Sequence, residues 1–420
     1  MVTPIAANPQ QSAWRDVWIL AVAQIVAGSG AFLALTTMIL TLQDTGATGL
    51  AVAAVTVAAS LPVVVLAPVT GRLADRFDSR LLMVIAGLIQ VAGCLLLSTA
   101  DGTVARVACV VLIYAGTALG MPVRTALLPA MVTSDDLPRA SAINQSAAVV
   151  GSMIGPPLAG FAYHAVGSAP GTLRWASVGF LATIAAGLLV RTRRGKRMGE
   201  EHPAVAPGPR VPMDGLLKIV FIGIAAAVAA ISAVDVVAVF FVRDTLEASA
   251  QTYGLVMATW PIGMVIGAWA QAKLAEKASD VRLTAWLFIT LGMTAAGVVM
   301  LAAVGSAPWM VPIWLAGGIL NGADNVLVMT LVARRSPVEG RGHVAAVMQA
   351  WIQGALLAGY VGAGLALTAA ASPRLIILTC GVLAVVTVAS ITPWVRAATR
   401  RSEENVTAVA IPDRVPQPQE

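Results

Sequence analysis

The sequence predicts an all-α membrane protein with twelve transmembrane helices in two pseudo-symmetric six-helix bundles. Its 420 residues are 58% hydrophobic and only 11% charged, whereas soluble domains carry about 25% charged residues. Twelve apolar runs are long enough to cross a bilayer core of about 30 Å, which needs roughly 20 residues per helix. The two halves of the chain also repeat each other. A soluble globular enzyme, a disordered protein and a fibrous protein are therefore nearly excluded.

The predicted helices are apolar on every side, as lipid-embedded helices are. In the first half they cover residues 17–42, 48–69, 81–99, 104–126, 141–166 and 172–190. In the second half they cover residues 217–242, 251–272, 283–304, 309–332, 344–371 and 374–395. Glycine and proline are frequent inside these runs, which suits membrane helices because neighbouring helices satisfy the freed backbone groups.

The remaining segments are polar. Residues 1–16 form an N-terminal cytoplasmic segment, and residues 191–216, basic at first and proline-rich later, form a cytoplasmic linker between bundles 17–190 and 217–395. Residues 396–420 form a polar cytoplasmic tail that we expect to be disordered.

Basic residues fix the expected orientation. With both termini inside, all but four of the 27 lysines and arginines lie on the inner side, the exceptions being Arg106, Arg174, Arg243 and Arg374. Because cytoplasmic segments carry the excess of Lys and Arg, we expect a multi-pass protein of the cell inner (plasma) membrane with cytoplasmic termini. The first apolar run is too long for a cleavable signal peptide.

Several other classes of site find no support in the sequence. The three cysteines lie in separate apolar runs and the three histidines are scattered, so neither disulfides, a metal site nor a clustered catalytic centre is predicted. No glycine-rich phosphate loop is present, which disfavours ATP coupling. We expect no enzyme activity, no cofactor, no nucleic-acid partner and a monomer in contact with lipid.

The two halves are related by an internal repeat. The stretch 273–277 (KLAEK) matches 72–76 (RLADR) at an offset of 201 residues, and Gly322 and Arg341 match Gly120 and Arg139 at an offset of 202. These matches fall at equivalent places in the two predicted bundles. Parallel repeats of this kind are typical of secondary transporters with a substrate site between the halves.

The loop at residues 71–80 (GRLADRFDSR) connects the second and third predicted helices. Gly71 permits close packing, Asp75 can accept from a helix N-terminus, and Arg72, Arg76 and Arg80 can pair with carboxylates. Contacts made in one conformation and broken in another would make this loop, hereafter the latch loop, a conformational latch. The alternative is a basic loop that only sets topology.

The latch loop resembles the signature of the major facilitator superfamily, although Asp78 and Ser79 replace a usual glycine and a usual basic residue. Its Arg-Phe-Asp form, together with residues 122–129 and 140–145, resembles the branch of bacterial siderophore and macrolide exporters. The resemblance covers about residues 15–395. It implies the major facilitator fold and alternating access.

The fifth predicted helix carries residues 151–160 (GSMIGPPLAG), which resemble the antiporter motif of exporters in this superfamily, with Ala142 and Ala159 replacing two glycines. Gly151, Gly155 and Gly160 allow close helix approach and Pro156 bends the helix. The alternative is a generic packing face of small residues.

Two acids lie at membrane depth, Asp235 in helix seven and Asp324 in helix ten. Charged residues there are costly and are functional candidates. The family arrangement lets both face a central cavity, where each could load and release a proton. The alternative is a hydrogen-bonded structural acid or a salt bridge. Helix four lacks the mid-helix arginine common among drug–proton antiporters.

Further cavity candidates are polar or aromatic residues in the predicted helices. They are Gln24, Tyr114, Arg124, Asn321, Asn325 and Tyr360, with Trp260, Trp314 and Trp351 as groups that could stack on an aromatic substrate or simply pack. Arg124 could pair with Asp75 or meet an anionic substrate.

Together these features predict a secondary active transporter. The expected activity is proton-coupled export of small amphipathic organic molecules such as drugs, macrolides or siderophores, with the proton gradient as the energy source. An importer or a carrier of lipid-like substrates with the same fold is the alternative, and a membrane-embedded enzyme or scaffold is a remote one.

Overall fold

The computed structural model describes residues 11–193, 213–337 and 341–410, and within these ranges every regular element is helical. Most of the predicted linker and both chain ends fall outside the described residues. The first half contains α1 (Trp14–Asp44), α2 (Gly49–Val65), α3 (Ala67–Arg76), α4 (Ser79–Leu97), α5 (Thr103–Met131), α6 (Leu137–Val166) and α7 (Ala169–Leu189). The second contains α8 (Gly215–Ile231), α9 (Ala233–Phe240), the π-helix η1 (Phe241–Thr245), α10 (Ala250–Lys277), α11 (Asp280–Ala302), the 3₁₀ turn η2 (Ala307–Trp309), α12 (Met310–Arg335), α13 (Arg341–Thr368) and α14 (Pro373–Ala410).

These helices are consistent with the twelve predicted membrane crossings, of which eleven are also apolar enough along the described chain. Ten stretches are long and apolar enough to span a bilayer, with α8, α9 and η1 together forming one of them. The pair α2 and α3 forms another crossing that bends by 48°, close to Pro68, the second residue of α3. The twelfth is α6, whose 30 residues reach about 45 Å at 1.5 Å per residue. The predicted fold class is confirmed.

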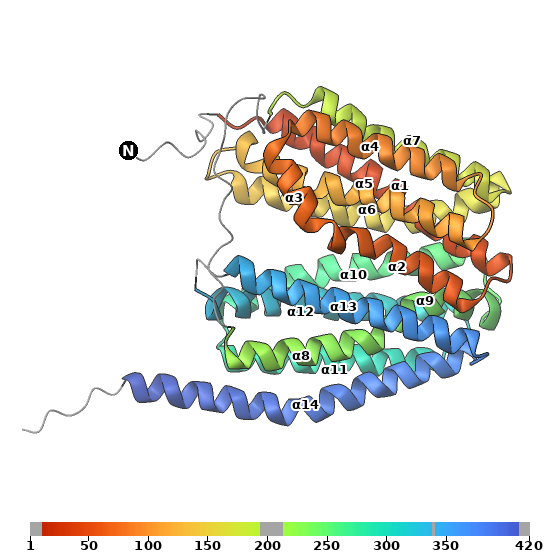
Figure 1. The fold of residues 1–420 in the computed structure, drawn as a ribbon. Coiled ribbons are helices and arrows are strands. Elements are labelled where there is room, and N and C mark those ends of the chain that lie inside the picture. Colours follow the sequence, from red (N-terminus) through yellow and green to blue (C-terminus); the bar gives the residue numbers. More distant parts are fainter. Residues whose placement is uncertain (1–10, 194–212, 338–340, 411–420) are drawn as a thin grey trace, which may run out of the picture.

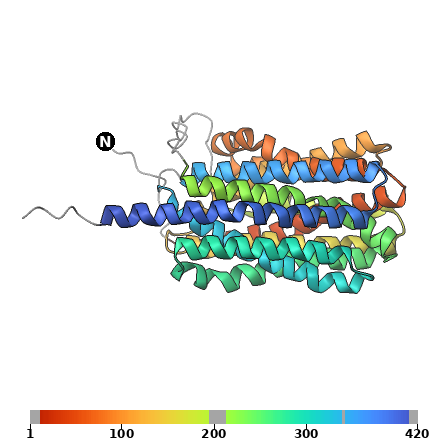
Figure 2. The same cartoon turned by 90° about the horizontal axis from the view of Figure 1, so that it is seen from below.

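Helix boundaries differ from the predicted ones mostly by a few residues, with two larger differences. Helix α3 continues to Arg76 and so includes residues 71–76 of the predicted latch loop, and the other difference is at the C-terminus. Helix α14 continues to Ala410 and in Figure 2 runs well past the other helices. The expectation of a disordered tail from residue 396 is therefore wrong for residues 396–410. This stretch is rich in alanine, arginine and glutamate, which favour helix.

The two halves lie side by side in Figure 1, with α1–α7 above α8–α14. We call the end where α1 begins and α14 finishes the terminal end, and the opposite end, which carries the α1–α2 and α13–α14 turns, the far end.

Buried apolar side chains show how the halves are joined. One cluster occupies the far end and includes residues of both halves, among them Leu40 and Val52 of the first and Val237 and Ala363 of the second. Toward the terminal end the core divides into two separate clusters, one within each half. Apolar burial therefore joins the halves at the far end.

Candidate functional site

Two helix pairs carry most of the contact between the halves, α2 with α13 and α6 with α10. Glycines bring each pair together at the far end. A Cβ atom on Gly364 of α13 would lie 2.5 Å from the Cβ of Ala53, and one on Gly254 of α10 would lie 2.3 Å from the carbonyl oxygen of Pro156. Such distances leave no room for a side chain, so these glycines are required for the observed approach.

The antiporter-like motif has two packing partners. Gly151 lies on the α1 backbone at Ile25, and Gly155 lies on α1 at Phe32. Gly160 instead meets the backbone of Ala250 and Gln251 on α10 of the other half. The motif is thus a face of small residues that packs within the first half and, at its far end, across to the second.

A polar network also links the halves at the far end. The Arg243 guanidinium pairs with the Asp44 carboxylate at 2.8 Å, and its Nε donates to the Gln43 side chain at 3.2 Å. Tyr163 donates to Asp44 at 2.7 Å, and Gln43 donates to Asp244 at 2.7 Å. We call these five residues the far-end network.

Sequence reasoning missed the far-end network, because its residues lie at helix ends and read as loop positions. Two signals were present. Arg243 is one of the four basic residues on the predicted outer side, and Gln43 and Asp244 are separated by the repeat offset of 201. Equivalent ends of the two bundles therefore meet there.

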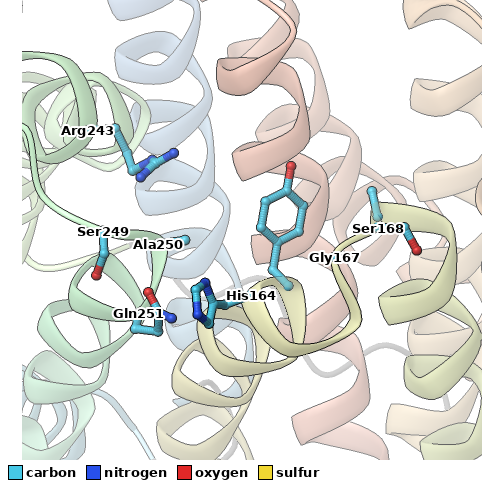
Figure 3. Close-up of a pocket in the computed structure, with 9 residues that line it drawn as sticks. His164, Gly167, Ser168, Arg243, Ser249, Ala250 and Gln251 are labelled. Atoms are coloured by element: carbon cyan, nitrogen blue, oxygen red, sulfur yellow. The ribbon is translucent and has the colours of Figure 1, made fainter.

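Beside this network the far end holds a pocket of about 370 Å³ between the halves. Figure 3 shows Arg243, Ser249, Ala250 and Gln251 on one side, with His164 and the turn at Gly167 and Ser168 on the other. Its lining is mostly polar, which suits an aqueous vestibule more than a site for an apolar molecule.

Asp235 lies on α9 within the region that the far-end core surrounds. Its immediate neighbours Val234 and Val236 are buried, whereas Asp235 itself is exposed. Tyr360 of α13 donates a hydrogen bond to one carboxylate oxygen at 3.2 Å. Tyr253 of α10 is buried in the same far-end core as the neighbours of Asp235. Because Asp235 is exposed within a membrane-spanning stretch, an accessible space lies beside its carboxylate.

Asp324 occupies a different environment. It is buried on α12 and accepts a hydrogen bond from Thr290 of α11. Helix α11 packs against α8, α12 and α14, all in the second half. The two acids, which the sequence treats alike, therefore lie in different environments: Asp235 is exposed, whereas the contacts of Asp324 match the alternative of a hydrogen-bonded structural acid. Which of them couples to protons stays a prediction.

The other cavity candidates are dispersed. Tyr114 packs against the far-end core, while Gln24 and Asn321 are half-buried on α1 and α12. Asn325 is exposed and lines an open hollow of about 680 Å³ between α10 and α12. Among the hydrogen bonds of the described residues, Tyr360 alone of the six candidates reaches a predicted coupling acid.

Arg124 lies half-buried near the terminal end of α5, folded over Gly120, where an added Cβ would lie 2.8 Å from its Nη1. Within the described chain it has no ion pair, and the pair with Asp75 considered from the sequence is not formed.

The latch loop makes few contacts in this conformation. Arg72, Asp75 and Arg76 are exposed, and no described residue pairs with Asp75. A Cβ on Gly71 would meet nothing within 4 Å. Asp78, one of the departures from the usual motif, caps α4 by accepting from the Arg80 backbone N–H at 2.7 Å.

The segment of the second half that repeats the latch loop, residues 273–277, is held by contacts from two arginines. Arg334 donates to the carbonyl oxygens of Ala275, Glu276 and Ala278 at the end of α10. Arg335 pairs with Asp280 at 2.8 Å and with Asp214 at 2.7 Å. At the places offset by 202 residues, the first half has Thr133 and Ser12 instead, whose hydroxyl oxygens lie 3.4 Å apart. At these equivalent places the second half thus has charge pairs and the first half has a contact between two hydroxyl groups.

Comparison with known proteins now identifies the fold family. The sequence matches the Major Facilitator Superfamily over residues 20–359. The chain belongs to this superfamily. No curated protein matches it in sequence.

Solved structures share the fold at low sequence identity. A bacterial homolog of the human lysosomal transporter Spinster, inward-facing and unoccupied, has a TM-score of 0.71 at 12% identity, covering 94% of this chain and 98% of its own. An inward-facing bacterial homologue of the iron transporter ferroportin has a TM-score of 0.69 at 14% identity, covering 91% and 99%. A mutant of the peptide transporter POT has a TM-score of 0.71 at 14% identity, covering 94% and 98%. The chain is accordingly a multi-pass membrane protein with a transporter fold.

Proposed function

We propose that the protein is a proton-coupled exporter of small amphipathic organic molecules that works by alternating access. The observation that carries the proposal is the division of the apolar core, which joins both halves at the far end and separates them toward the terminal end. Two packed halves that meet at one end only are what a rocking transporter requires.

In this proposal the terminal end faces the cytoplasm, because it carries most of the lysines and arginines. The structure then corresponds to a cytoplasm-open state, in which a molecule enters from the cytoplasm and reaches the space beside Asp235. The membrane is the cell inner membrane, and the proton gradient is the energy source.

Asp235 is the proposed proton-coupling residue. It combines membrane depth, an accessible carboxylate and a hydrogen bond from Tyr360. Asp324 is proposed instead to stabilise the α11–α12 contact through Thr290. This assignment separates two acids that sequence alone treats alike.

Transport in proteoliposomes with an imposed pH gradient tests the proposal. A panel of amphipathic organic molecules is expected to move against the proton flux, with Asp235→Asn abolishing the coupled movement. Asp324→Asn is the matched control and is expected to retain it. Solute movement in the same direction as protons would replace export by import, and no proton-dependent flux in the wild type would refute the coupling.

A further inference from the structure

We propose that Asp235, together with Tyr253, Tyr360 and Trp260, forms a binding site for an organic cation. This inference rests on the proposed function, since it specifies which charge class of small molecule the transporter carries. It goes beyond the coupling role, because the same carboxylate becomes the recognition group for the substrate.

The charge balance around Asp235 favours a mobile cation. One carboxylate oxygen accepts from Tyr360, and no described residue donates to the other. The nearest basic residue along its span is Arg243, eight positions onward and already paired with Asp44. An ionised carboxylate at membrane depth without a counter-ion is costly, and a bound organic cation would supply the missing charge.

The accessibility of the Asp235 carboxylate also supports a binding site there. Six residues around Asp235, namely Ala233, Val234, Val236, Val237, Ala238 and Val239, are each at most 4% exposed. Asp235 is exposed among them, so this carboxylate is accessible although its neighbours on α9 are not. Because the far-end core and network close the route beyond it, a molecule would arrive from the terminal end.

Aromatic residues on α10 extend the site away from the carboxylate. Tyr253, which is buried in the same far-end core as the neighbours of Asp235, and Trp260 are seven residues apart, which is two helical turns on one face and about 10 Å. Trp260 is half-buried and packs edge-on against Trp314 at 5.6 Å between ring centroids. Gly317 makes room for this indole, since a Cβ there would lie 2.6 Å from Cζ3 of Trp260.

This arrangement fits an amphipathic cation. Aromatic rings attract cations through the negative face of the ring, and the half-buried indole of Trp260 offers apolar surface to the rest of the molecule. The carboxylate would set the preference for positive charge. A carboxylate that takes either a proton or an organic cation also links the two by exchange, and Tyr360 is the titratable group that is hydrogen-bonded to it.

A pair of probes of nearly equal shape and opposite charge tests the site. Radiolabelled tetraphenylphosphonium and tetraphenylborate are equilibrated with the purified full chain in detergent. We expect the cation to bind at least tenfold more tightly than the anion. Asp235→Asn is expected to remove that preference, and Tyr360→Phe and Trp260→Leu to weaken cation binding several-fold.

Controls separate the site from general effects on folding. Asp324→Asn, on the α11-facing side of α12, is expected to bind the cation as the wild type does. Asp235→Glu keeps the negative charge and is expected to retain cation binding, so it serves as the second test variant where Asp235→Asn folds poorly. Equal cation affinity in Asp235→Asn and the wild type, or a preference for the anion, would overturn the inference.

Flux measured in parallel distinguishes the two proposals. Charge-selective binding without any solute transport would remove the proposed function and leave the site. Proton-driven transport of neutral or anionic molecules without charge-selective binding would leave the function and remove the site.

Discussion

The far-end network allows a quantitative prediction about the balance between conformations. Replacing Asp44 by Asn removes the charge that Arg243 pairs with at 2.8 Å and weakens the hydrogen bond from Tyr163. The Arg243 and Asp44 side chains are 24% and 31% exposed, so the ion pair is worth about 1 kcal/mol or less. The hydrogen bond adds about 1 kcal/mol.

These contacts exist only where the halves meet at the far end, so their loss destabilises the far-end-closed state by about 1–2 kcal/mol. That free energy corresponds to a roughly 5–30-fold shift in the population ratio toward far-end opening. Spin labels at Asp101 and Gly305, exposed far-end loop positions on opposite halves, would report the shift by double electron–electron resonance in a cysteine-free background.

Matched variants make the measurement decisive. Glu247→Gln changes an exposed far-end acid that has no ion pair in the described chain, and we expect it to leave the distances unchanged. Exchanging the charges in Asp44→Arg with Arg243→Asp is expected to recover part of the closed population that each single change loses. An unshifted distribution in Asp44→Asn, or the same shift in Glu247→Gln, would refute the reasoning.

Three further predictions follow from the packing and the charge contacts. Gly254→Ala places a Cβ where Pro156 leaves only 2.3 Å, so the same spin labels should report more far-end opening, whereas Gly362→Ala, with nothing within 4 Å, should not. Arg334→Ala leaves carbonyl oxygens at the end of α10 without their donor and is expected to cost about 2–3 kcal/mol, read as a lower Tm; an unchanged Tm would contradict the capping role. Asp75→Ala is expected to leave Tm unchanged, because Asp75 is exposed and has no partner among the described residues. If the latch loop stabilises the state in which the terminal end is closed, the same variant should shift accessibility labelling toward the terminal-end-open state. Labelling without a shift would remove the latch role.

The fold could be predicted from the sequence because its determinants are simple. Bilayer thickness sets the helix length, and the repeat at an offset of about 201 residues sets the division into halves. The bend between α2 and α3 was not predicted, since many prolines in membrane helices leave the helix unbroken, as Pro122 does in α5. The break after Val65 lies beside Pro68, the second residue of α3, which lacks the backbone N–H that a continuous helix would use there.

The site was only partly predictable, because an all-apolar helix does not reveal which face points inward. Asp324 and Asp235 lie on equally apolar helices, and only packing shows that the first meets Thr290 while the second remains accessible. The partnership of Asp235 with Tyr360 joins residues 125 positions apart, which no spacing pattern encodes. The sequence therefore locates both acids in the membrane, but only the orientation of each helix shows that their environments differ.

The five-residue π-helix η1 links the winding of one helical turn to the contacts at the far end. Its N–H to carbonyl bonds reach one residue further than those of an α-helix, as Leu246 to Phe241 shows at 2.9 Å. Rewinding such a segment to α geometry turns the residues within and after it around the axis by up to about 100°, which would carry Arg243 and Asp244, both inside η1, away from α1. The winding of this one turn is thereby coupled to the far-end network between the two bundles. The hydrogen-exchange rate of the Leu246 amide would report a change in that winding.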